Sequence, residues 1–140
     1  MKLRRRNERG QGLVEFAIVL PILLIILSGV LDLGRLWYAY VAVTDAAAEG
    51  ATYAALDPSD GNGIYKRAEE ASGGLVQIEP DGVTLVCPTC PTAASGDQVT
   101  VTVAYTFTLA TPFLHAMVPD GQLLLRAVAN EAILAGQLSP

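Results

Sequence analysis

An apolar segment near the N-terminus, residues 13–33, limits what this chain can fold into more than any other feature. It reads LVEFAIVLPILLIILSGVLDL, and as a helix its 21 residues would be roughly 31 Å long, which matches a hydrocarbon core about 30 Å thick. Its only charged residues, Glu15 and Asp32, stand near its two ends, where each carboxylate can reach a membrane interface. Pro21 is expected to kink or loosen the helix. The segment therefore predicts a single transmembrane helix.

The charges are divided unevenly around this segment. Residues 1–10 carry five basic side chains and one acid, whereas the other 130 residues carry four basic and 13 acidic side chains. A basic flank holds the N-terminus in the cytoplasm, so residues 1–10 are predicted to be a cytoplasmic leader and residues 57–140 an extracytoplasmic domain. This remainder is long enough for one small domain but not for two. Its acidic character argues against nucleic acid as a partner.

Further motifs lie within and around the apolar segment. They are Gly10 followed at four intervening residues by Glu15-Phe16, the Leu20-Pro21 break, and the alanine-rich stretch 45–55. With these motifs the chain resembles the TadE-like minor pilins (pseudopilins) of the tight-adherence, or Flp, pilus system. The resemblance lies within residues 10–56. Family members usually carry arginines in the alanine-rich stretch where this chain has Ala48 and Thr52, so the resemblance carries over no role for those charges.

The resemblance implies a structural pilus-assembly component and not an enzyme, with no cofactor. A prepilin peptidase would recognise Gly10, Gln11, Glu15 and Phe16 and cut between Gly10 and Gln11. The implied partners are other pilins or pseudopilins, the peptidase, the membrane assembly platform and the lipid bilayer. The protein would be a single-pass component of the cytoplasmic membrane or of the pilus itself.

Glu15 and Pro21 are the candidate residues for subunit assembly. A carboxylate in a low-dielectric layer needs a partner, and cutting after Gly10 creates a free amino group at Gln11. In a filament or bundle, Glu15 of one subunit would face the amino terminus of its neighbour. The alternative is that Glu15 only reaches back to the cytoplasmic interface. Two other interpretations of the N-terminus also remain, an ordinary secretory signal and an uncleaved anchor that carries an extracytoplasmic binding or adhesion module.

The helix is predicted to continue beyond the membrane, from Gln11 to Leu56, where Asp57-Pro58 ends it. Small residues such as Ala42, Ala46 and Gly50 recur on it at four-residue spacing, which allows another helix to approach closely. The remaining pattern predicts a short helix and an antiparallel sheet, and so an α+β fold. The expected ranges are a helix over 64–72, a hairpin of 75–79 with 83–87, and paired strands over 99–109 and 122–133.

Cys87 and Cys90 form a C-x-x-C motif between a predicted strand and a loop of small residues. A redox centre needs a helix N-terminus to lower the thiol pKa, and two cysteines alone do not fill a zinc site. Outside the cytoplasm such a pair tends to oxidise, so we expect a structural disulfide. A membrane-tethered thiol oxidoreductase and a shared metal site are the alternatives. The loop DPSDGNG, from Asp57, lacks the spacing of a calcium-binding EF-hand.

Overall fold

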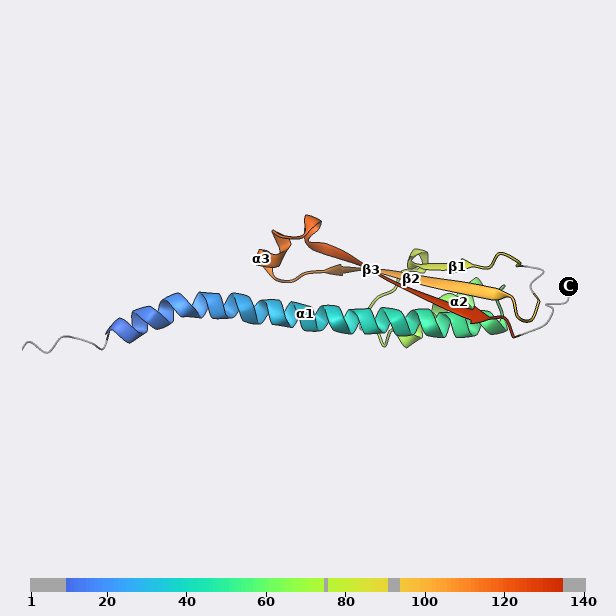
Figure 1. The fold of residues 1–140 in the computed structure, drawn as a ribbon, viewed down its shortest axis with the longest axis horizontal. Helices are drawn as coiled ribbons and strands as arrows, with labels where there is room; N and C mark the ends of the chain where they lie inside the picture. The colour runs from blue at the N-terminus through green and yellow to red at the C-terminus, as the bar shows by residue number, and fades with distance from the viewer. Residues whose placement is uncertain (1–9, 75, 91–93, 135–140) are drawn as a thin grey trace, which may run out of the picture.

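The computed structural model describes residues 10–74, 76–90 and 94–134, and its most prominent element is one very long helix (Figure 1). Nearly all of the predicted leader, residues 1–9, lies outside the described residues. The elements, in chain order, are α1 (Gln11–Leu56), α2 (Gly61–Ala71), the 3-10 turn η2 (Pro80–Gly82), β1 (Val83–Val86), β2 (Gln98–Thr108), α3 (Pro112–His115), the 3-10 turn η3 (Pro119–Gly121) and β3 (Gln122–Ala132).

Helix α1 has the bounds that the sequence predicts, Gln11–Leu56, and its 46 residues make a rod roughly 69 Å long. It remains helical through Pro21, and its N-terminal quarter bends away from the axis of the rest (Figure 1). The rod has two unlike halves. Its buried residues begin at Asp32 and are otherwise small, mostly alanine, whereas the large apolar side chains before Asp32 are exposed apart from the half-buried Leu20.

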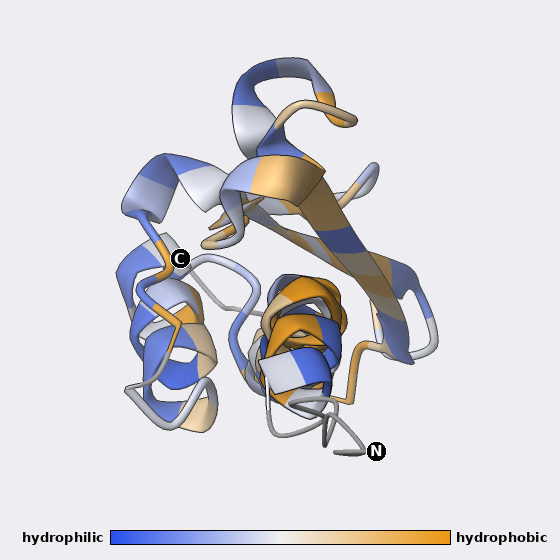
Figure 2. Cartoon of the chain, turned by 90° about the vertical axis from the view of Figure 1, so that its left-hand side faces the viewer, coloured by the Kyte–Doolittle hydropathy of each residue, from blue (hydrophilic) through white to orange (hydrophobic). Residues whose placement is uncertain are grey.

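The C-terminal half of α1 packs under a three-stranded antiparallel sheet and beside α2, as the end-on view in Figure 2 shows. Its alanine stripe lets both neighbours come close. A Cβ added at Gly50 would lie 3.3 Å from Val101 of β2 and 3.6 Å from Ala68 of α2. The small residues of this stripe are therefore buried within the chain's own domain, with α2 as the helix that approaches them.

The sheet has the order β1-β2-β3, with both pairs antiparallel. In the central strand Val99, Val101 and Val103 are fully buried against the helices, because alternate side chains of a strand face the same side. The strand Gln98–Thr108 and its partner Gln122–Ala132 each lie within one residue of the predicted ranges. A long helix with a small antiparallel sheet confirms the predicted α+β class.

The predicted hairpin of residues 75–79 with 83–87 is wrong. Within the described part of this segment, residues 76–79 form no strand, and β1 pairs instead with β2, Leu85 opposite Val101. Val76 and Ile78 are buried as the alternation predicts. Their backbone carbonyls, however, accept hydrogen bonds from side chains of the preceding helical segment, Ser72 Oγ at 2.9 Å and Tyr65 Oη at 3.2 Å. Side-chain donors thus replace the neighbouring strand as partners of this backbone.

The short helix α2 begins at Gly61, three residues before the predicted start. The reason is a cap, because Asp60 Oδ1 accepts a hydrogen bond from the Gly63 N–H at 2.9 Å. Asp60 Oδ2 also accepts a hydrogen bond from the Tyr53 hydroxyl at 2.9 Å, which joins the start of α2 to α1. Gly73, with φ of 69°, follows the helix in the left-handed conformation that the sequence indicates for its end.

Candidate functional site

The predicted processing site lies at the free end of α1. Gly10 and Gln11 are exposed, and Gly10 stands at the N-cap without a side-chain cap. Glu15 and Phe16 are exposed one turn further on. Glu15 Oε1 accepts one hydrogen bond, from Gln11 Nε2 at 3.1 Å. Because a carboxylate has about four acceptor positions, Glu15 keeps most of its capacity for another donor, such as a second subunit.

The surface between this end and Asp32 is apolar on every side. Apart from the half-buried Leu20, the exposed fractions of its large apolar side chains run from 45% at Ile25 to 71% at Leu13. A helix that is apolar all round is found inside a large core or within a membrane, and no described element covers it. Helix α1 is long and apolar enough to cross a membrane.

Asp32 marks the point where the bare half of α1 meets the domain, and its carboxylate is only 2% exposed. It accepts hydrogen bonds from the backbone N–H groups of Thr111, at 2.8 Å, and of Ala110, at 3.2 Å. Arg35, one turn along α1, adds an ion pair at 3.1 Å. Asp32 therefore fastens the connection between β2 and β3 to the outer end of the apolar segment.

Reasoning from the sequence did not single out this role of Asp32. A charged residue at the edge of an apolar span is a functional candidate by default, and this position in the sequence could have pointed to Asp32. Its partners were hidden because Ala110 and Thr111 lie 78 and 79 residues away in the chain. Ala110 and Thr111 both contribute backbone N–H groups, which no side-chain pattern predicts, and the Thr111 side chain adds a further hydrogen bond.

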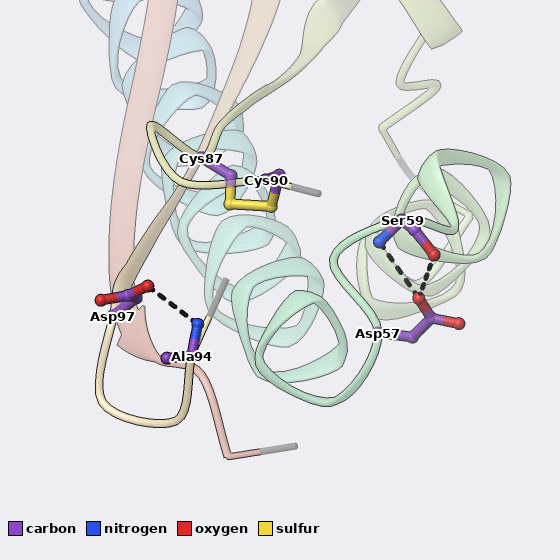
Figure 3. The surroundings of a disulfide bond; sticks show 6 residues. All are labelled: Asp57, Ser59, Cys87, Cys90, Ala94 and Asp97. Atoms are coloured by element: carbon purple, nitrogen blue, oxygen red, sulfur yellow. Dashed lines mark hydrogen bonds between the residues drawn. A yellow bond between two sulfur atoms is a disulfide. The ribbon is translucent and has the colours of Figure 1, made fainter. Parts of the chain in front are cut away.

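The cysteine pair lies at the opposite end of the domain, just after β1 (Figure 3). The Cys87 and Cys90 sulfur atoms are at bonding distance, with Cα atoms 5.4 Å apart, and both residues are half-buried against the core. Residues 88–90 form a turn, and among the described residues no helix begins at the motif to lower a thiol pKa by its N-terminus. A closed pair of this kind suits a structural disulfide.

Two carboxylates near the cysteine pair are used for local capping (Figure 3). Asp57 Oδ1 accepts hydrogen bonds from the Ser59 hydroxyl at 2.7 Å and from its N–H at 3.0 Å. These bonds, the hydroxyl first, lower the pKa of Asp57 below its usual value. Asp97 Oδ2 likewise accepts a bond from the Ala94 N–H at 2.9 Å. Among the described residues, no group of acids, histidines or cysteines is arranged to hold a metal ion.

Fold and site together define a class of protein that has one candidate membrane-spanning helix continuing into a small α+β domain. Within that class, residues 10–52 match a family model described as TadE-like protein, which confirms the resemblance over these residues. No curated protein and no solved structure matches the chain. The matched region contains Ala48 and Thr52, which are exposed, and Thr52 donates a hydrogen bond to the Ala48 carbonyl at 2.9 Å.

Proposed function

We propose that this chain is a minor pilin or pseudopilin that takes part in assembly of a Tad/Flp-type pilus. The observation that carries the proposal is the exposed apolar segment of α1 before Asp32, with Gly10, Gln11 and Glu15 at its N-terminal end. This segment lies within the region that matches the TadE-like model. An anchor that never assembles has no need of a carboxylate one turn into its span. The role is structural, and other pilins and the membrane assembly platform are the proposed partners.

In this proposal α1 crosses the cytoplasmic membrane over residues 13–33, with residues 1–10 in the cytoplasm and residues 57–140 outside. The basic side chains of the leader favour this orientation. A prepilin peptidase removes the leader after Gly10. The cut leaves Gln11 with a free amino group, and Glu15 of a neighbouring subunit is the proposed partner of that group.

The first experiment tests processing. Intact-mass measurement of the protein from membranes that contain the peptidase should give a chain beginning at Gln11. Gly10→Val should block the cut, whereas Gly12→Val should leave it unchanged. The two glycines form a matched pair, because a side chain added at either meets no other atom within 4 Å. A wild-type chain that still begins at Met1 would favour the permanently anchored binding or adhesion module instead.

The second experiment tests Glu15 in assembly. Glu15→Gln keeps the size and polarity of the side chain but removes its charge, so we expect normal insertion and impaired assembly. Val19→Ala, one turn further along the exposed face, is the control that should assemble normally. The readouts are carbonate-resistant membrane association for insertion and recovery of sheared pili for assembly. Normal assembly by Glu15→Gln and by Glu15→Ala would show that Glu15 is only an interfacial residue.

A further inference from the structure

The connection between β2 and β3, residues 109–121, carries exposed apolar side chains at an unusual place. Phe113 is 56% exposed and Met117 is 70% exposed, and both lie in or just after the short helix α3. Between residues 109 and 118 the chain contains no aspartate, glutamate, lysine or arginine. Single exposed apolar side chains are ordinary, but two in one segment without charged residues, at the end of an apolar span, indicate a surface that is covered in use.

Asp32 fixes the position of this connection along the axis of α1. Its carboxylate accepts the Thr111 N–H at 2.8 Å, and Asp32 stands one residue before the end of the apolar span. Phe113 follows Thr111 by two residues, so their Cα atoms are at most about 7.6 Å apart. Figure 1 shows α3 as the part of the domain that reaches furthest back along α1 toward its N-terminus. Phe113 and Met117 thus lie at the outer edge of the proposed membrane span.

Beside its attachment at Asp32, the connection leaves part of the α1 surface uncovered. A groove of about 480 Å³ lies between α1 and the sheet at this level, lined on the helix side by Val30, Leu31 and Gly34 and on the sheet side by Phe107. The Arg35 guanidinium lies 5.4 Å from the centre of the Phe107 ring. An apolar groove beside a cationic side chain suits the boundary between acyl chains and phosphate headgroups, where both chemistries meet.

We propose that the β2–β3 connection is a second membrane contact, in which Phe113 and Met117 insert into the outer leaflet beside α1. The inference rests on the proposed membrane span of α1 and adds a second anchoring point, which fixes the rotation and tilt of the domain over the bilayer. The proposed occupant of this surface is lipid, because the surface continues the apolar span, which lipid surrounds while the subunit stands alone in the membrane; a contact with a neighbouring subunit is one outcome of the test. Asp32 is the positioning residue that holds the connection at the required depth.

The test measures depth in the bilayer with the full chain in phosphatidylcholine–phosphatidylglycerol vesicles at low protein density. Single cysteines are introduced as Phe113→Cys, Met117→Cys, Val128→Cys and Val19→Cys, with the native cysteine pair left oxidised, and each is labelled with bimane. Val128, on the outer face of the sheet, is the matched control because it is 57% exposed against 56% for Phe113. Val19, within the span, reports whether α1 is inserted at all.

We expect lipid carrying a doxyl group near the headgroup to quench the labels at 113 and 117 several-fold more than the label at 128. Iodide in the water should quench the label at 128 most. A label at 19 that lipid quenches, with 113 and 117 behaving like 128, would overturn this inference and leave the proposed function standing. Labels at 113 and 117 shielded from both lipid and iodide would overturn it in favour of a protein contact. A label at 19 that lipid does not reach would overturn the membrane span and this inference together.

Discussion

Replacing Asp32 by alanine should release the β2–β3 connection from α1 without unfolding the rest of the domain. The substitution removes the acceptor of two backbone N–H groups, a hydrogen bond with the Thr111 side chain and one ion pair. Thr111 is only 6% exposed, so its orphaned N–H costs about 1–3 kcal/mol. The Ala110 N–H belongs to an exposed residue and can bond to water instead.

The ion pair adds little to this estimate. The Asp32 side chain is only 3% exposed, but that of Arg35 is 56% exposed, so solvent screening keeps the pair near the value of an exposed pair, on the order of 0–1 kcal/mol. Alanine also has a helix propensity better than that of aspartate by up to about 0.7 kcal/mol, which offsets part of the loss. The net expectation is about 1–2 kcal/mol, which corresponds to roughly 5- to 30-fold more frequent opening of the connection.

Amide hydrogen exchange on the full chain in lipid nanodiscs measures this opening directly. Exchange at Ala110 and Thr111 should accelerate in Asp32→Ala, while exchange in the central strand at Val101 should not change. Asp32→Asn keeps one carbonyl acceptor and should lie between wild type and alanine, and Arg35→Ala should lie close to wild type. The reasoning fails if Asp32→Ala leaves Thr111 exchange unchanged, or if Arg35→Ala accelerates it as much.

Three further predictions concern the domain. Joint replacement of Cys87 and Cys90 by serine should lower stability only slightly, because the disulfide closes a very short loop. The double variant should keep its fold and its pilus assembly. Thiol labelling of native protein without reductant should find both sulfurs blocked. Gly50→Leu should destabilise the domain by about 1–3 kcal/mol through overpacking. Gly34→Leu is the control and should not destabilise it, because no atom lies within 4 Å of a Cβ added at Gly34. Denaturant titration compares the stabilities of the two variants. Because the pKa of Asp57 is lowered in the fold, its contribution to stability should be present above about pH 4 and be lost as the pH falls through the lowered pKa. Asp57→Ala should therefore weaken the loss of stability at acid pH. An unchanged loss of stability at acid pH would contradict that role of Asp57.

The sequence by itself determined the elements whose signal is local. The bounds of α1 follow from an unbroken apolar and helical pattern that ends at Asp57-Pro58, and the central strand follows from strict alternation of Val99, Val101 and Val103 with polar or small residues. The motif from Gly10 to Phe16 is likewise a matter of spacing along the chain, and together with the Leu20-Pro21 break and the alanine-rich stretch 45–55 it indicated the family model that residues 10–52 match.

Only the tertiary structure decided which distant groups meet. Alternation at Val76 and Ile78 correctly indicates a buried face but does not say whether the backbone pairs with a strand or, as here, with the side chains of Ser72 and Tyr65. The backbone partners of Asp32, the N–H groups of Ala110 and Thr111, are invisible in the sequence for the same reason, since every residue except proline carries such a group. Residue patterns encode which face is apolar, whereas contacts between segments depend on how the whole chain packs, and the contact between Asp32 and the β2–β3 connection is of the second kind.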